Sequence, residues 1–524
     1  MRVPTSILWK CPRIDPSAVG RVCPKDARHQ STLLSDAVSL EALDRARPFQ
    51  EIPGPKPLPL LGNLHRYMPI IGEYTKKEWH EAQRKKFHQY GSIVREEIAP
   101  GYNIVHLFDP KDMEVVSWNE GKFPKREFFV AMRMMREQNP EVYSSAGVAA
   151  ANGESWHRVR TRSQVPMLRP EIMKTYLPQM NVIAEDLIRR IRLLRQPNHQ
   201  VPKLIDEFFK WALESVTYIL FNERMGCLDD NVSPDSMSQK YIQAVNQFFQ
   251  LSAKVELASI PIWRFYPSLS PSYQKLKKVH DFFFEHAMQY VQSKMEDLEK
   301  ESDSKNMSLM EKLILRGSPG DASIMAVDAM AAGIDTTSLT TAYVLRNLAA
   351  NPEKQKKLQE EIDRIVPNKS PLSVDGLNQL SYLRACVKES MRLCPTVQGT
   401  SRILDRDIVL SGYRIPANTQ IILNYNVSST QEKYFKDADK YIPERWLKSG
   451  TGQREDREAF AFVPFGFGPR MCIGRRIAEL EMFTLLTKIL QNFWVENKND
   501  ELQIRFQLVL MISSPLRYEF YDRR

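Results

Sequence analysis

Near its C-terminus the chain reads FGFGPRMCIG, from Phe465 to Gly474, and sets a single cysteine among glycines. Glycine permits tight turns and positive φ, so backbone amides can gather around the sulfur of Cys472. Arg470 stands two residues ahead of it. A thiolate held by amide donors beside a cation has a depressed pKa and is a strong ligand for iron. The segment therefore predicts an iron ligand at Cys472, although a lone cysteine is more often a buried core residue.

The spacing of five residues in this segment resembles the signature of the cytochrome P450 superfamily of heme-thiolate monooxygenases. These residues are Phe465, Gly468, Arg470, Cys472 and Gly474. With ordinary residue frequencies, a chance match at five fixed positions has a probability on the order of 10⁻⁵. The resemblance implies heme b (iron protoporphyrin IX), with Cys472 as axial ligand, Phe465 and Gly474 beside the cofactor, and Arg470 at a propionate. It also implies a mainly α fold with small β-sheets (α+β), in which a long central helix lies over the heme and the cysteine loop.

Upstream, AAGIDTT spans residues 331–337 within a helical pattern from about residue 321 to 349. At 1.5 Å per residue this helix would be roughly 40 Å long. Small residues in mid-helix leave space beside the backbone. Asp335 and Thr336 then offer an acid and a hydroxyl side by side, which the resemblance implies is the catalytic relay that delivers protons to dioxygen. Taken alone, the motif fits equally well a close helix contact with a solvated Asp335.

KESMR places Glu389 three residues before Arg392, and PERW supplies Arg445 further on. Charges three apart on a helix can meet, but such pairs are usually solvated and weak. In the resembling family, matching residues form a buried charge triad that braces the cysteine loop. Loss of one member would leave the others unpaired.

Trp156 and Arg160 stand four residues apart in ESWHRVR, and Arg402 follows in GTSRILD. In the resembling family these positions donate to the heme propionates, which suits the preference of Trp N–H and arginine for carboxylates. Without the other motifs, ordinary helix packing would explain the Trp–Arg spacing.

The rest of the 524 residues read as a helical body with small sheets. A Pro- and Gly-rich connector over residues 51–63 precedes the folded part. We expect one domain over residues 48–524, since no repeat of 20–50 residues is visible. Apolar residues at three- and four-residue steps predict helices over residues 76–90, 171–194, 204–222, 238–251, 272–300 and 352–365. Short β-like runs cover residues 93–98, 103–107, 407–410, 420–424 and 503–512.

The N-terminal 47 residues predict a mitochondrial transit peptide and linker. Residues 1–35 carry six basic and two acidic side chains, with Ser and Thr interspersed and no apolar core of a secretory signal. A basic tail that targets nothing stays possible, and a zinc role for Cys11 and Cys23 fits less well, because His29 alone stands nearby. No run of 18 apolar residues occurs that would predict a transmembrane helix. The cysteines lack C-x-x-C pairs and predict no disulfide framework.

Two pairs of cations bear on the choice of electron donor: one pair lies one turn apart in the helix of the KESMR motif, and the other directly follows the cysteine motif. They are Arg384, Lys388, Arg475 and Arg476. Clustered cations steer an acidic partner, and GRRIAELEM resembles the mitochondrial branch of the family. That resemblance implies a ferredoxin docked on these cations and reduced by NADPH through a ferredoxin reductase. A solvated charged surface is the alternative.

The resemblance implies insertion of one oxygen atom into a lipophilic substrate, such as a steroid, sterol, fatty compound or xenobiotic. Residues 128–142, 241–257, 325–333, 396–400 and 510–513 would line the pocket. Residues 253–269 are expected to form a loop whose aromatic and cationic side chains suit a membrane interface, and a loop packed on the body fits equally well. We expect peripheral attachment to the matrix side of the mitochondrial inner membrane and no nucleic-acid partner. A heme-thiolate isomerase or dehydratase without external electrons, or a heme-binding sensor, are the alternatives. Retention of Asp335, Thr336 and the cations argues against both.

Overall fold

The computed structural model describes residues 39–68, 72–75, 78–230, 233, 235–258, 261–300, 307–447, 458–499 and 501–523. Most of the predicted transit peptide lies outside these residues. Its last part, residues 39–47, contains helix α2 (Leu40–Arg45). The Arg47 N–H donates to the Gly412 carbonyl at 2.9 Å, so this part is attached to the β-rich end of the molecule.

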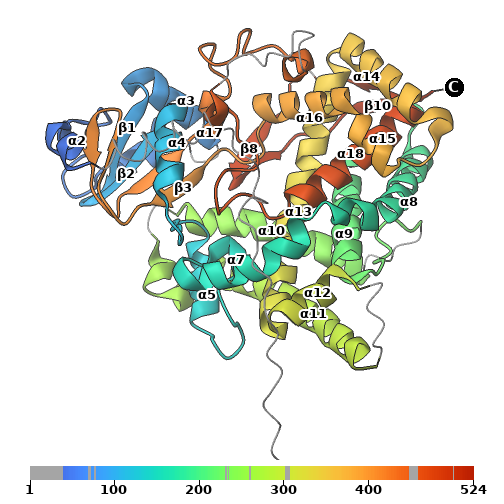
Figure 1. Cartoon of the computed structure of the whole chain (residues 1–524), viewed down its shortest axis with the longest axis horizontal. Coiled ribbons are helices and arrows are strands. Elements are labelled where there is room, and N and C mark those ends of the chain that lie inside the picture. The colour runs from blue at the N-terminus through green and yellow to red at the C-terminus, as the bar shows by residue number, and fades with distance from the viewer. Residues whose placement is uncertain are drawn as a thin grey trace, which may run out of the picture.

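The β-rich end is built on a four-stranded sheet (Figure 1). Its order is β1 (Ile93–Ala99), β2 (Tyr102–Leu107), β6 (Gln420–Leu423) and β3 (Thr400–Ile403). The β2–β6 pair is parallel and the other two pairs are antiparallel. Helices α3 (Trp79–Tyr90) and α4 (Pro110–Asn119) and the hairpin β4 (Ile408–Leu410) with β5 (Tyr413–Ile415) complete this end.

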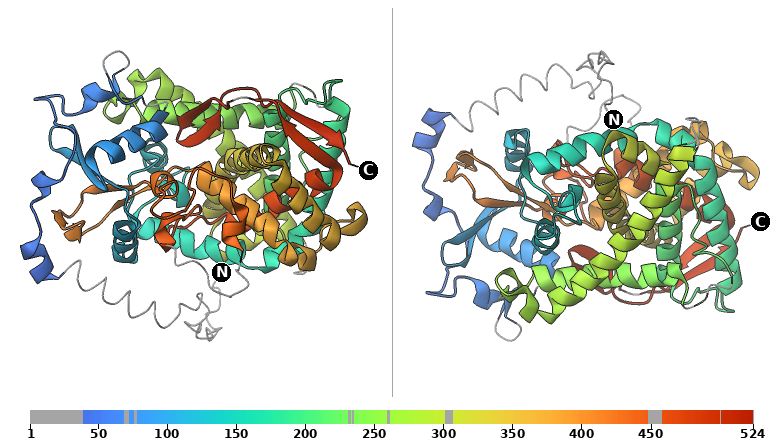
Figure 2. Two further views of the ribbon diagram at one scale, coloured as in Figure 1. Left: turned by 90° about the horizontal axis from the view of Figure 1, so that it is seen from above. Right: turned by 90° about the horizontal axis from the view of Figure 1, so that it is seen from below.

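Helices make up the larger end of the molecule, as Figures 1 and 2 show. They are α5 (Val130–Glu137), α6 (Gly147–Ala150), α7 (Gly153–Leu168), α8 (Glu171–Leu194), α9 (Leu204–Phe221), α10 (Met237–Glu256), α11 (Pro271–Lys300), α12 (Leu309–Arg316), α13 (Pro319–Ala349), α14 (Pro352–Ile365), α15 (Val374–Gln379), α16 (Ser381–Leu393) and α18 (Arg475–Asn492). The short helix α17 (Tyr425–Ser428) instead packs against α3 at the β-rich end. Two further antiparallel pairs lie near the C-terminus: the hairpin of β8 (Ile504–Gln507) with β9 (Val509–Ile512), and β7 (Phe493–Asn497) with β10 (Tyr518–Asp522), between which that hairpin lies in the chain. The expected mainly α structure with small sheets is confirmed.

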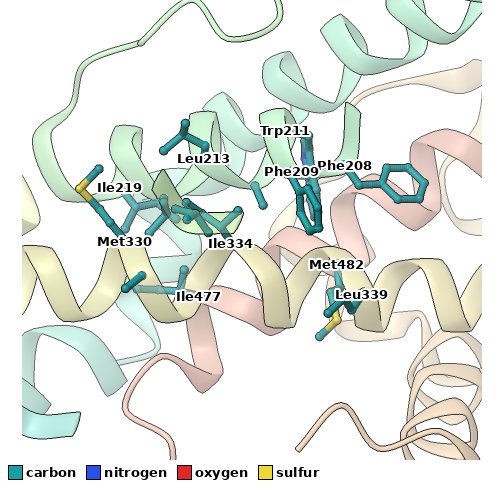
Figure 3. Close-up of a cluster of buried hydrophobic side chains, with 14 of the residues drawn as sticks. Phe208, Phe209, Trp211, Leu213, Ile219, Met330, Ile334, Leu339, Ile477 and Met482 are labelled. Atoms are coloured by element: carbon teal, nitrogen blue, oxygen red, sulfur yellow. The ribbon is translucent and has the colours of Figure 1, made fainter. Parts of the chain in front are cut away.

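The central helix α13 has 31 residues and is about 46 Å long. Ser318 caps its first turn by accepting from the Asp321 N–H, and Pro319 begins the helix, where its missing N–H costs nothing. Its apolar faces pack between α9 and α18 (Figure 3). The Ser338 hydroxyl also donates to the Phe208 carbonyl at 3.0 Å. These contacts hold α13 in the core and fix where its side chains point.

Most predicted helices are confirmed, with small differences at their ends. Two segments differ from the prediction. Residues 253–256, expected as a loop, continue α10. The run over 503–512 folds into the β8–β9 hairpin, because Leu508 takes a positive φ of 65° and reverses the chain. Among the helices of the described residues, none is long and apolar enough to span a membrane.

Candidate active site

The cysteine loop is a tight turn directly ahead of α18. Gly466 and Gly468 have φ of 70° and 71°, which glycine adopts without strain. A Cβ on Gly468 would overlap the Glu120 carboxylate. The Cys472 N–H donates to the Phe465 carbonyl at 2.8 Å, which closes the turn. The loop thus presents the cysteine from a rigid backbone.

The Cys472 thiol does not have the depressed pKa that the sequence predicts. Although part of the side chain is accessible, the surrounding protein raises its pKa above the ordinary value by desolvation. A backbone hydrogen bond with Gly474 and the charges of Arg160 and Arg475 lower the pKa, but by less than desolvation raises it. The protein alone therefore favours the thiol. A bound metal ion is the group that would hold the sulfur as a thiolate.

Four arginines gather beside the cysteine loop: Arg126, Arg160, Arg402 and Arg470, here called the arginine cluster. Arg470 donates to the Ala151 carbonyl at 2.7 Å and to Asn152 Oδ1 at 2.8 Å. Its guanidinium lies 4.3 Å from the ring centroid of Trp156. Arg402 forms a buried ion pair with Glu120. Four segments far apart in the sequence thus supply one positively charged site.

The arginine cluster holds more positive charge than its surroundings balance. Burial, followed by the neighbouring cations Arg126 and Arg402, lowers the pKa of Arg470 to about 8. Burial lowers the pKa of Arg126 and of Arg160 to about 10. Buried donors without a partner among the described residues are Arg126 Nε, Arg160 Nε, Arg470 Nη1 and Trp156 Nε1. An arrangement of unpaired donors and unbalanced cations suits an anion such as a carboxylate.

Arg126 belongs to this cluster, but we did not predict it from the sequence. It lies between Lys125 and Glu127 without a recognisable spacing to any other motif. Its N–H donates to Asn152 Oδ1 at 3.1 Å, the same oxygen that accepts from Arg470. Only this tertiary contact reveals the residue.

On α13, one strip of an otherwise buried helix is accessible. Ala332 is exposed, and Gly333 and Thr336 are partly accessible. The Thr336 hydroxyl donates to the Ala332 carbonyl at 2.7 Å. Asp335 points elsewhere: it is fully buried, and neither carboxylate oxygen has a hydrogen-bond partner within the described part of the chain. Burial raises its pKa to about 8. The acid and the alcohol are therefore neighbours in sequence with no hydrogen bond between their side chains.

The structure brings Glu389, Arg392 and Arg445 together. The Glu389 carboxylate accepts from Arg392 Nη2 at 2.7 Å and from Arg445 Nε at 3.0 Å. It also accepts from the Trp446 indole at 2.8 Å and from the Ile442 N–H at 3.0 Å. Every charge of this triad is paired or hydrogen-bonded.

The family model "Cytochrome P450" matches residues 52–520 of the chain. The chain belongs to the cytochrome P450 family. Its relatives include "Probable cytochrome P450 301a1, mitochondrial" of Drosophila melanogaster, 34% identical over 95% of this chain and 91% of the relative. "Cytochrome P450 302a1, mitochondrial" of the same species is 31% identical, over 91% and 96% respectively. "Cytochrome P450 10" of Lymnaea stagnalis is 30% identical, over 98% and 92%.

As a cytochrome P450 the protein is a heme-dependent monooxygenase, and the family's cofactor is heme b. The residues present fit this group. Its two carboxylates suit the unpaired donors of the arginine cluster and of Trp156, and a cysteine sulfur suits its iron. Among the described residues no group of three or more His, Cys, Asp or Glu side chains offers another metal site.

The four cations expected to dock ferredoxin on this P450 have different environments. Arg384 is half-buried and donates to backbone carbonyls of Leu377 and Asn378, at 2.5 and 2.9 Å. Arg475 and Arg476 are accessible and share one carboxylate, Glu479, at 3.0 and 3.8 Å. Lys388 is exposed on α16. Hydrogen bonds thus hold the Arg384 side chain at the end of α15, whereas the side chains of Lys388, Arg475 and Arg476 reach the surface.

Proposed function

We propose that this P450 is a mitochondrial monooxygenase that receives electrons from NADPH through a ferredoxin reductase and a ferredoxin. The observation that carries the proposal is the pair of accessible cations Arg475 and Arg476 next to the cysteine loop, and Lys388, exposed on α16, is proposed to belong to the same docking surface. Arg475 and Arg476 begin α18 directly after that loop and share a single acid. Such a surface attracts an acidic electron carrier. The names of relatives that are called mitochondrial, and the basic leader outside the described residues, support the same location.

When bound, heme supplies the activation of dioxygen and its insertion into a C–H bond. In our proposal Cys472 ligates the iron, the arginine cluster and Trp156 neutralise the propionates, and Phe465 and Gly474 border the cofactor. Thr336 offers its hydroxyl on the accessible strip of α13. Asp335, with a pKa of about 8, keeps its carboxyl largely protonated at neutral pH. It is therefore a proton donor that reaches Thr336 only through a movement of its side chain or through water.

We further propose that the protein attaches peripherally to the inner mitochondrial membrane from the matrix side. Ile262, Phe265, Tyr266 and Leu269, which follow α10, are exposed large apolar side chains. Apolar groups with Arg264 among them suit a lipid interface. Trp263, expected among these residues, is buried, and its indole donates to the Val255 carbonyl at 2.8 Å. It anchors the segment to the body of the protein.

The substrate in this proposal is lipophilic. Of the residues expected to line the pocket, Phe129 and Phe248 lie with their ring centroids 6.4 Å apart, and Phe248 and Phe249 at 5.5 Å. An aromatic lining of this kind favours apolar ligands.

Reconstitution with ferredoxin, its reductase and NADPH tests the proposal. We expect a thiolate-type carbon monoxide spectrum and oxygen consumption that depends on ferredoxin. Turnover of a substrate without NADPH would instead support an isomerase or dehydratase. A normal spectrum with no electron uptake would support a sensor. With a substrate found by screening, T336A should keep the spectrum while more NADPH is lost to peroxide; unchanged coupling would remove Thr336 from the relay.

A further inference from the structure

Arg136 at the end of α5 is a buried cation that joins three separate parts of the helical end. It is 1% exposed. Its Nη1 donates to Asp328 Oδ1 on α13 at 2.8 Å and to the Ala146 carbonyl just before α6 at 2.8 Å. Its Nε donates to His280 Nε2 on α11 at 2.9 Å. One side chain thus fixes α5 against two long helices.

His280 completes this contact as a neutral ring. Burial, together with the charges of Arg136 and Lys277, lowers its pKa well below the ordinary value. Since Nε2 accepts from Arg136, the ring proton belongs on Nδ1, which lies 3.3 Å from the Tyr143 hydroxyl. Tyr143 in turn donates to Asp281 Oδ1 at 3.3 Å. The segment between α5 and α6 is thereby held on α11 at a second point.

Asp328 uses both of its oxygens. While Oδ1 accepts from Arg136, Oδ2 accepts from the Ala149 N–H in α6 at 3.1 Å. Gly147, with φ of 79°, lies so close that a Cβ there would overlap Arg136, Asp328 and Ile324. The backbone of α6 therefore closes tightly over the ion pair.

The ion pair lies beside the proposed substrate pocket. Asp328 precedes Ala332 by four residues, so it stands one helical turn from the accessible strip of α13. At the other end of α5, the N–H of Ala131 donates to Glu256 on α10 at 2.7 Å. Phe129, which caps α5, faces Phe248. Anchored at both ends, α5 carries Phe129 and Met132 in one defined position.

We propose that Arg136 is a positioning residue that sets which ligands the pocket accepts, by fixing α5 against α13 and α11. The inference rests on the proposed function, since it assumes that the pocket lies beside α5. Breaking one half of a buried pair leaves the other charge buried and unpaired. We therefore expect α5 to be fully docked while the pair is intact and displaced when it is broken. Without Arg136, the aromatic and apolar side chains of α5 lose their fixed place, and large apolar ligands lose contacts while small ones do not.

Ligand binding by the heme-loaded protein tests this inference without turnover. The variants are R136K and D328N, and the matched control is R133K on the same helix, where Arg133 is half-buried and pairs with Glu127 at 3.2 Å. The probes are imidazole and 4-phenylimidazole, titrated by absorbance on protein with a normal carbon monoxide spectrum. Lysine cannot reach Asp328, His280 and the Ala146 carbonyl together.

We expect R136K and D328N to weaken 4-phenylimidazole binding roughly tenfold while imidazole binding changes less than twofold. The larger ligand loses its contacts with α5, whereas the smaller one makes none to lose. R133K should change neither. An unaltered ratio of the two dissociation constants in both variants overturns the inference. If these variants fail to fold, R136L/D328L replaces the whole pair by apolar groups, which buried pairs often tolerate, and the same ratio decides. Failure of ferredoxin-supported turnover would refute the proposed function but leave these binding ratios measurable.

Discussion

Two buried groups of arginines in this chain, the triad of Glu389, Arg392 and Arg445 and the arginine cluster, have their charges balanced in opposite ways. In the triad, Glu389 accepts from Arg392 and Arg445, and Arg392 also donates to the carbonyls of Ser429, Ala438 and Lys440. In the arginine cluster Glu120 pairs with Arg402, while donors of the other three arginines lack partners among the described residues. When the chain itself pairs its buried charges, removing one partner leaves the others unpaired and destabilises the fold. Donors left unsatisfied are suited to bind an anion.

Breaking the triad should have the largest effect. E389Q keeps the shape of the side chain but turns one acceptor oxygen into an amide that faces donors. Because both arginines stay buried, we expect a loss of about 3–5 kcal/mol in the free energy of unfolding. Denaturant unfolding of the heme-loaded protein measures it. A loss below 1 kcal/mol would show that the triad does not depend on its charge.

Asp335 extends the comparison to a buried acid whose oxygens have no hydrogen-bond partner within the described ranges. Its pKa is about 8 in the folded chain against an ordinary 3.8, so the folded state keeps a proton that the unfolded chain has released. Stability should therefore fall between about pH 4 and pH 8, by up to about 1.4 kcal/mol per unit. D335N removes this dependence, and at pH 8 we expect it to be more stable than the parent by about 2–4 kcal/mol. Parallel stability–pH curves for both proteins would contradict the burial of an unpaired acid.

Removing one charge from the arginine cluster should affect stability differently from removing one from the triad. R470M removes one of several mutually repelling cations, so the heme-free protein should be no less stable than the parent. Heme, however, loses a charged donor worth about 1.5–3 kcal/mol, and its dissociation should be roughly 10–100 times faster. Heme transfer to an excess of a heme-accepting protein gives the rate. Equal rates for parent and variant would remove Arg470 from the site.

The smallest effect is expected at the surface, where charges are solvated. K388E should slow ferredoxin reduction of the heme by about tenfold at low salt, and the difference should shrink as ionic strength rises. R384E is the contrasting variant, because Arg384 is bonded to the end of α15. It should lower stability more than it changes the reduction rate. Stopped-flow reduction on protein with a normal carbon monoxide spectrum separates the two, and an unchanged rate for K388E would refute its docking role.

Much of the fold and part of the site can be predicted from the sequence. Local spacing was sufficient wherever the relevant neighbours are close in the chain. The helix predicted over about residues 321–349 is α13, which begins two residues earlier at Pro319. Glu389 meets Arg392 because three residues make almost one helical turn. The cysteine loop needs its glycines at Gly466 and Gly468 for its positive φ values. Such features depend on backbone geometry over a few residues, which the sequence alone determines.

Only the tertiary structure decided which distant segments meet and how deeply each group is buried. Arg126 joins Arg470 through Asn152, and Arg136 on α5 meets Asp328 on α13. Desolvation by the surrounding protein raises the pKa of Cys472 and outweighs the lowering by Arg160 and Arg475. The surrounding protein also separates Asp335 from Thr336, whose places on α13 face different surroundings. Solvation and long-range charge depend on what packs against a residue from other elements, and no spacing along the chain encodes that directly.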